Sequence, residues 1–235
     1  MASISDAATF KFDKDHPQHL SAICVYCTLI ELARSELTLL ENGDVTAMPV
    51  VLRSIFEAYA DLRAIIEDPG YYKNMYATFL DEKLRFLRNV ERSEANPFLV
   101  PVAARLDIKS ETVRLQEERK ELEDASREPL SAVARFRAAK LEHEYESMYW
   151  LLCLEGHNNL SALDDRHIEK AGDQFGVVMF KAADADDLVR LLDALAAFVT
   201  DGASRVHRFL GTGLDPKYRS IQERLADIRR RYPAS

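Results

Sequence analysis

The sequence predicts an all-α protein, a single-domain bundle of five to seven helices. Apolar residues recur at helical spacing along most of the 235 residues, and only 8 Gly and 8 Pro interrupt the pattern. The apolar content of 47% and the charged content of 30% are those of a folded globular chain. No repeat and no flexible linker divides the sequence, so we expect one domain over residues 1–235.

Stop signals divide the helical pattern into separate helices. The expected helices cover residues 19–41, 46–67, 71–92, 130–156, 184–209 and 217–231 approximately. A further helix over about Lys109–Arg127, in the polar stretch 105–128, has few large apolar residues and is expected to project or to contact a partner protein. Val and aromatic residues within 164–181 predict a short β-hairpin. The first 15 residues are expected to be poorly ordered.

Charge and composition exclude several classes of protein. The net charge of −8 lacks the basic character of a general nucleic-acid-binding protein. No apolar run is long enough to span a bilayer and no signal peptide is visible, so we expect a cytoplasmic protein without a membrane partner. Cys24 and Cys27 form a C-x-x-C pair, but they lie inside a helical pattern, which favours core cysteines over a redox motif.

Arg53 and Glu57 lie one helical turn apart on the second expected helix. They share their side of that helix with small alanines, whereas large apolar residues fill the other side. Close approach of another helix would bury this pair, which would then need a further hydrogen-bond partner such as Tyr149 or His157. The alternative is an ordinary exposed ion pair that contributes little stability.

The segment YESMYWLLCLEGHNN, residues 145–159, ends an apolar helix face in polar groups. Tyrosine, tyrosine, cysteine and His157 recur at every fourth position and therefore share that face. Imidazole, guanidinium and amide groups bind phosphate or exchange protons near neutral pH. In the alternative interpretation His157 only caps its own helix. The candidate binding residues are Arg53, Glu57, Tyr149, His157, Asn158, Arg166 and His167.

Neither a metal nor a cofactor is expected. Helical di-iron proteins repeat Glu-x-x-His on facing helices, and that motif does not occur in this sequence. Glu31, Glu57, Glu146 and His157 would converge on a metal only if their helices packed in one particular way. Glycine-rich phosphate loops and the Gly-x-Ser-x-Gly elbow are missing as well.

Two motifs together resemble an uncharacterised bacterial family of helical domains of unknown function. The first is VLRSIFEAYADL, residues 51–62, and the second is YESMYWLLCLEGHNN. The family pairs an Arg-Ser-hydrophobic-Phe-Glu helix with a Tyr…Tyr…His helix end, and Cys153 stands where a small hydroxyl residue is frequent. The resemblance covers roughly residues 16–170 and implies a helical fold and a site at these positions. The matching residues are Arg53, Ser54, Phe56, Glu57, Tyr145, Tyr149 and His157.

The chain is more distantly similar to HEPN helical domains, many of which are metal-independent ribonucleases of toxin and defence systems. Their hallmark is an arginine, four to six residues, and a histidine. Arg137 and His143 satisfy that spacing, although about one such match is expected by chance, and no arginine precedes His157 at that distance. Under this resemblance His157 or His143 is the general acid or base, and Arg137 stabilises charge on the RNA phosphate.

These observations favour a cytoplasmic bacterial binding or regulatory protein of a defence or stress system, with a polar cluster between helices. We expect a homodimer, because helical bundles have apolar surface to share, and a protein partner for the 109–127 helix. The alternative is a HEPN-like endoribonuclease whose substrate is RNA.

Overall fold

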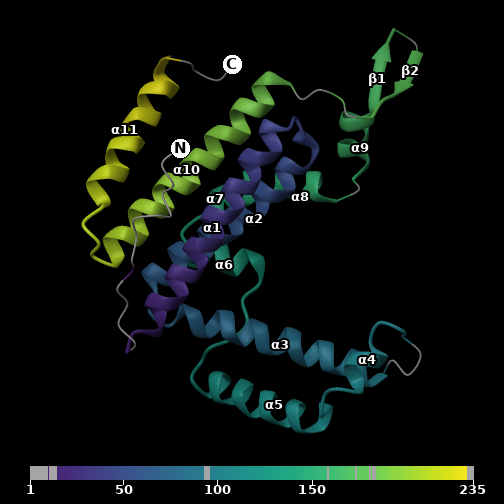
Figure 1. Ribbon diagram of the computed structural model, residues 1–235, viewed down its shortest axis with the longest axis vertical. Helices are drawn as coiled ribbons and strands as arrows, with labels where there is room; N and C mark the ends of the chain where they lie inside the picture. The colour runs from purple at the N-terminus through teal and green to yellow at the C-terminus, as the bar shows by residue number, and fades with distance from the viewer. Residues whose placement is uncertain are drawn as a thin grey trace. The chain divides into compact units, whose positions relative to one another are not determined.

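The computed structural model describes residues 10, 15–92, 96–157, 159–172, 174–179, 181 and 184–231, which form helices and a two-stranded hairpin (Figure 1). The all-α class and the short hairpin are therefore confirmed. Residues 1–9 and 11–14, which belong to the segment expected to be poorly ordered, lie outside the described residues. The chain packs as two compact units, residues 68–134 in one and residues 1–67 with 135–235 in the other. The expected single domain stays a prediction.

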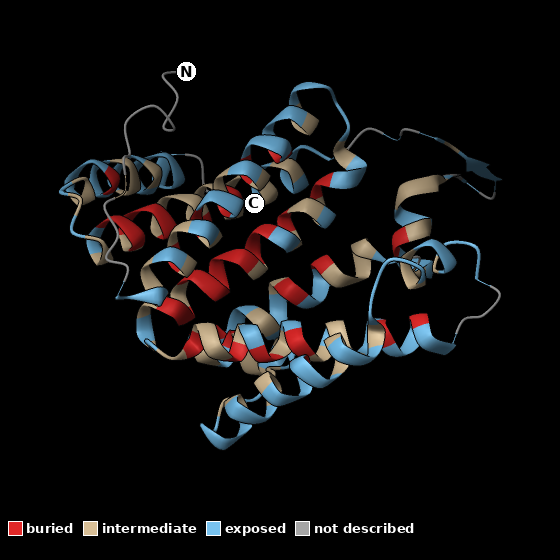
Figure 2. Cartoon of the chain, turned by 60° about the horizontal axis from the view of Figure 1, so that its bottom comes forward, coloured by how far each residue is buried: buried red, intermediate tan, exposed pale blue. Residues whose placement is uncertain are grey.

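Three long helices form the core of the larger unit. They are α1 (Pro17–Glu41), α2 (Met48–Glu67) and α10 (Ala185–Phe209), and each contacts the other two. The short 3-10 turn η2 (Val45–Ala47) precedes α2, and α11 (Asp215–Arg231) packs against α10. Buried residues lie on the inner faces of these helices and exposed residues on the outer faces (Figure 2). The buried share is largest in α2, which makes α2 the central helix of the unit.

Close contact between α10 and its neighbours depends on Gly202. A Cβ atom at this position would lie 2.7 Å from Leu29 Cδ2 of α1, and would also contact Leu62 and Tyr59 of α2. A side chain larger than hydrogen would therefore push α10 away from both helices. The glycine brings the polar residues next to it on α10 close to α2.

Local backbone chemistry explains where these helices begin and end. Gly43 takes a φ of 76° after α1, and the Asp44 N–H donates to the Leu39 carbonyl over 2.9 Å. The Asp184 side chain accepts from the Asp186 N–H over 2.7 Å and so caps the start of α10. The five expected helices 19–41, 46–67, 71–92, 184–209 and 217–231 are confirmed to within about two residues at either end.

The helix expected over residues 130–156 is broken, so that part of the prediction is wrong. In the structure this range contains α6 (Ala132–Ala138), α7 (Glu142–Glu144), the π-helical turn η3 (Tyr145–Tyr149) and α8 (Trp150–Gly156). Lys140 has a left-handed φ of 58°, and the Leu141 N–H donates to the Phe136 carbonyl over 2.9 Å. Phe136 and Leu141 are both buried, and we attribute the break to their burial, which offsets the strain at Lys140.

The hairpin follows α9 (Leu160–His167). Its strands β1 (Ile168–Ala171) and β2 (Gln174–Val177) are antiparallel, with Ile168 opposite Val177. Phe175, Val177 and Met179 have exposed fractions of 71%, 81% and 79%. Phe175 and Val177 are two residues apart in β2 and therefore point to the same side of the hairpin, and Met179 follows the strand.

Cys24 and Cys27 are both exposed on α1, so the expectation of core cysteines is wrong. The buried face of α1 is centred on Tyr26 and Leu29, and the two cysteines point away from it. The chain's described ranges contain no helix that is long and apolar enough to cross a membrane.

The smaller unit is a helical hairpin of α3 (Tyr71–Arg92) and α5 (Ile108–Asp124), with the short α4 (Val100–Ala103) between them. Leu80 and Leu87 of α3 pack against Leu115 of α5, and partly buried leucine and isoleucine side chains surround them. Leu115 is the buried residue of α5, so the polar helix expected over about 109–127 is confirmed. Arg127 Nη1 binds Asp68 Oδ2 over 2.7 Å and joins the two ends of the unit.

Glu36 is a buried acid in the larger unit. It continues the buried face of α1 beyond Leu29 and Ala33 and is fully buried. Both carboxylate oxygens are buried, and neither has a hydrogen-bond partner among the described residues. Burial therefore raises the pKa of Glu36 to about 7, because the ionised form loses its hydration.

Replacing Glu36 by Gln tests this burial. An unfolded Glu ionises near pH 4.5, whereas the folded protein holds the Glu36 proton up to about pH 7. Protonation of Glu36 therefore makes its full contribution to the free energy of unfolding below pH 4.5. That contribution is lost as the pH rises through 7. In urea denaturation, the gain in unfolding free energy from Glu36→Gln should be about 1–3 kcal/mol larger at pH 8 than at pH 5. Glu31→Gln, at an exposed position of α1, is the control, and an equal pH dependence in both variants would contradict the burial.

Candidate functional site

Aromatic side chains from α2, α6, η3 and α10 pack beneath the site. The Phe56 ring of α2 stacks on Phe198 of α10 at 4.5 Å between centroids, and meets Phe136 of α6 edge-on at 4.8 Å. Phe136 also contacts the ring of Tyr149 at 4.7 Å. These contacts hold α6 and η3 against α2.

A polar cluster lies beside these rings, along one side of α2. Arg53 and Glu57 are four residues apart, and Arg53 Nε donates to Glu57 Oε1 over 3.2 Å. The Tyr149 hydroxyl donates to the same oxygen over 2.8 Å and accepts from Arg53 Nη2 at 3.3 Å. Three side chains from two segments of the chain therefore close a ring of hydrogen bonds.

Arg135 of α6 extends the cluster to Asp61, four residues after Glu57. Its Nε lies 3.0 Å from Asp61 Oδ1 and its Nη2 lies 2.5 Å from Asp61 Oδ2, which is a bidentate pair. Arg135 Nη1 is 3.8 Å from Glu57 Oε2. Two guanidinium groups and two carboxylates thus balance in charge. The side chains of Arg53, Glu57 and Arg135 keep exposed fractions of 27–29%, which leaves the cluster open to a solute.

The electrostatics of the cluster hold its protons in place. Burial, together with the Glu57 carboxylate, raises the pKa of Tyr149, so the hydroxyl remains a donor at neutral pH. Burial alone would lower the pKa of Arg53, but Tyr149 and Glu57 outweigh it and the pKa is raised. The Arg53 guanidinium also lies over the Tyr149 ring, 5.3 Å from its centroid.

Two polar atoms of the cluster make no hydrogen bond within the described residues. Arg53 Nη1 has no hydrogen-bond partner among the described residues, and it lies beside Gly156 at the end of α8, where an added Cβ would be 3.7 Å away. Glu57 Oε2 is near Arg135 at ion-pair distance but accepts no hydrogen bond from the part of the chain that the structure describes. The site therefore offers one cationic donor and one anionic acceptor.

Of the candidate binding residues, the structure brings together Arg53, Glu57 and Tyr149. His157 is exposed after α8, and its imidazole makes no hydrogen bond within the described ranges. Arg166 of α9 pairs instead with Glu155, with Nη2 2.7 Å from Oε2. Nδ1 of His167 lies 3.1 Å from the Val178 carbonyl oxygen. Asn158 lies outside the described residues.

The catalytic candidates of the nuclease alternative are not brought together. Arg137 of α6 and His143 of α7 are both exposed, and in the described chain no hydrogen bond or ion pair joins their side chains. No group of three His, Cys, Asp or Glu among the residues that the structure describes is placed to hold a metal ion.

Sequence reasoning missed Asp61 and Arg135. A signal for Asp61 was present, because it follows Arg53 and Glu57 at the same four-residue interval. For Arg135 the sequence holds no such signal, since its partner lies 74 residues away and the contact depends on the packing of α6 against α2.

The fold and cluster define a helical domain with a charge-balanced Arg–Glu–Tyr site on its central helix. The chain belongs to DUF5677, a family of unknown function, whose profile matches residues 19–175. That range contains every member of the cluster and confirms the resemblance to a helical family of unknown function. No curated protein and no solved structure matches the chain. The similarity to HEPN domains stays a prediction.

Replacing Glu57 by Ala should lower the free energy of unfolding by about 2 kcal/mol, measured by urea denaturation at pH 7. The Tyr149 hydroxyl and the Arg53 guanidinium then lose their shared acceptor, while both remain partly buried. Glu146→Ala, at an exposed position of η3, is the matched control. A loss below about 0.5 kcal/mol for Glu57→Ala would show that the cluster contributes no more than a surface ion pair.

Proposed function

We propose that this chain is a binding or regulatory protein of the bacterial cytoplasm, acting in a defence or stress system, and that its ligand binds at Arg53 and Glu57. The supporting observation is that two polar atoms of the cluster, Arg53 Nη1 and Glu57 Oε2, make no hydrogen bond within the described residues, although Glu57 Oε2 lies 3.8 Å from Arg135 Nη1. A donor and an acceptor held by the rest of a hydrogen-bonded network are oriented before a ligand arrives, which lowers the entropy cost of binding.

The ligand that this pair fits is a small polar molecule with both an acceptor and a donor, such as an amino acid or a nucleoside. A strongly charged anion fits less well, because the two carboxylates already balance the two guanidinium groups. The Tyr149 ring beneath Arg53 supplies an apolar surface on one side of the guanidinium.

The proposal includes a homodimer. Phe175 and Val177 of β2 and Met179 after it are exposed, and β2 pairs only with β1 within the described residues. Pairing of two copies along β2 would cover this edge and bring the apolar side chains of the two copies next to one another. Light scattering should give twice the monomer mass of 26.7 kDa, and Val177→Lys should reduce it to that of the monomer. A wild-type chain of monomer mass would rule the dimer out.

A protein partner for α5 is a further part of the proposal.

A thermal-shift panel of amino acids, nucleosides and nucleotides tests the ligand site. At least one compound should raise the Tm of the wild-type chain by several degrees, because a ligand that binds only the folded state stabilises it. Arg53→Gln should abolish that shift, whereas Arg114→Gln, at an exposed arginine of α5, should retain it. An equal shift in wild type and Arg53→Gln would place the ligand elsewhere.

Incubation of the purified chain with single-stranded RNA separates this proposal from the nuclease alternative. We expect no cleavage, since the candidate arginine and histidines are not assembled. Cleavage that His143→Ala or His157→Ala abolishes in a folded variant would establish the ribonuclease instead.

A further inference from the structure

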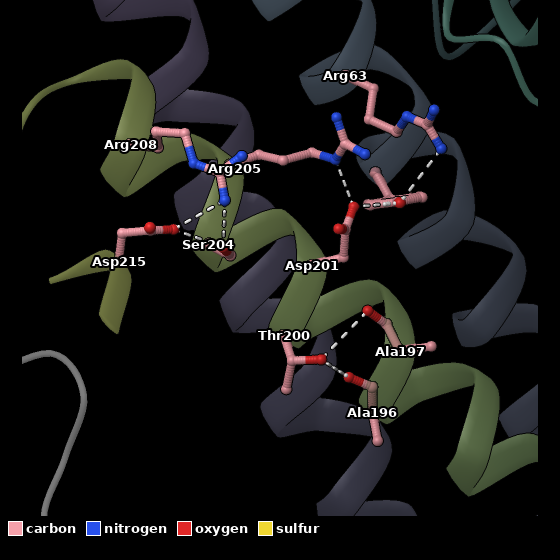
Figure 3. Close-up of polar contacts among 10 residues, drawn as sticks. Arg63, Ala196, Ala197, Thr200, Asp201, Ser204, Arg205, Arg208 and Asp215 are labelled. Carbon is pink, nitrogen blue, oxygen red and sulfur yellow. Dashed lines mark hydrogen bonds and ion pairs between the residues drawn. The ribbon is translucent and has the colours of Figure 1, made fainter. Parts of the chain in front are cut away.

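A second polar cluster lies farther along α2, where α2 faces α10 (Figure 3). The Tyr59 hydroxyl of α2 donates to Asp201 Oδ2 of α10 over 2.5 Å. Arg205, one turn after Asp201, donates from Nε to the same oxygen over 2.5 Å. Arg63 of α2 donates from Nη1 to the Tyr59 hydroxyl at 3.5 Å. Two arginines from different helices therefore converge on one tyrosine and one carboxylate.

Most of the donors of these two arginines are unused. A guanidinium carries five N–H groups in a planar fork. Arg63 Nε is buried and has no partner among the described residues, and its Nη2 has none there either. Beyond Tyr59 and Asp201, no described residue accepts a hydrogen bond from Arg205. Figure 3 shows Arg205 extending from α10 toward α2, and the Arg63 guanidinium of α2 bonded to the hydroxyl of the tyrosine that binds Asp201.

The cluster carries an excess of positive charge within an acidic chain. Asp201 binds Arg205, Arg63 binds only the Tyr59 hydroxyl within the described residues, and the nearby Glu67 is bound by Lys140, with Nζ 2.5 Å from Oε2. Three cations and two anions leave a local charge of about +1, although the whole chain has a net charge of −8. Two guanidinium groups that converge in this way are stabilised by a further anion.

Tyr59 keeps the cluster in this arrangement at neutral pH. Burial and the Asp201 carboxylate raise the pKa of Tyr59 to about 12, so its hydroxyl remains protonated and donates to Asp201. Asp201 in turn fixes the Arg205 guanidinium. The Arg205 guanidinium is therefore positioned before any ligand binds, and Arg63 Nη1 lies 3.5 Å from the hydroxyl of the same tyrosine.

We propose that Arg63 and Arg205 bind the phosphate group of a small molecule. Phosphate presents several acceptor oxygens around one centre, and planar guanidinium forks match them with paired, charge-assisted hydrogen bonds. Arg53 and Arg63 are ten residues apart on α2, which corresponds to roughly 15 Å along the helix, so this site is separate from the one proposed at Arg53.

Isothermal titration of the full-length chain with inorganic phosphate, at constant ionic strength in chloride, tests the site. Saturable binding is expected, and Arg63→Ala and Arg205→Ala should each weaken it about tenfold or more through loss of a charge-assisted hydrogen bond. Arg190→Ala, at an exposed arginine of the same helix α10, changes the net charge equally and should retain wild-type affinity. Absence of saturable phosphate binding, or an equal loss in Arg190→Ala and Arg205→Ala, would overturn the proposal.

Asp201→Asn distinguishes a binding site from a cluster that only stabilises the fold. Removing the carboxylate charge while keeping an acceptor oxygen should tighten phosphate binding several-fold, because Asp201 competes with phosphate for Arg205. Unchanged or weaker binding would overturn the proposal. Circular dichroism checks that each variant is folded, and Arg205→Lys, which keeps the charge but loses the fork, replaces Arg205→Ala if the latter unfolds.

Discussion

The carboxylates of Glu57 and Asp61 determine where α6 and η3, the segments that carry Arg135 and Tyr149, pack on α2. This helix is the most buried of the three long helices, yet it carries charged residues along one edge. A partly buried carboxylate must find a cation or a hydrogen-bond donor, since it has lost most of its hydration. Arg135 and Tyr149 supply these partners. The aromatic contacts beneath them add apolar burial, which does not fix one orientation of the packed segments. The polar pairs do, because their hydrogen bonds have one preferred geometry.

The same arrangement occurs twice on α2. In one cluster the Tyr149 hydroxyl donates to the Glu57 carboxylate, which holds Arg53. In the other, the Tyr59 hydroxyl donates to Asp201, which holds Arg205. Each tyrosine is kept protonated by burial and by its carboxylate, and each arginine retains donors for a ligand. The clusters differ in charge, because the first is balanced and the second has an excess cation, and this difference separates the ligands proposed for them.

Local patterns in the sequence predict most of the helices but not the break at Lys140. Periodicity and end signals such as Gly43 place the long helices, whereas Lys140 is neither glycine nor proline and its left-handed turn depends on burying Phe136 and Leu141. The exposed position of Cys24 was missed for a related reason, since helical periodicity alone does not say which face of α1 meets α2.

In the candidate site, too, sequence spacing predicts the contacts between neighbouring residues but not those between residues far apart in the chain. The four-residue spacing indicates that Arg53 and Glu57 are neighbours, and the need for a further partner suggests Tyr149. Arg135 and Asp201 lie 74 and 142 residues from their partners, and only the packed structure brings them together.

A double-mutant cycle of Asp61→Asn and Arg135→Gln, measured by urea denaturation, tests most directly whether such pairs hold α6 on α2. We predict a coupling energy of about 1.5–3 kcal/mol. A coupling below about 0.5 kcal/mol would contradict the account, because the aromatic packing alone would then be sufficient.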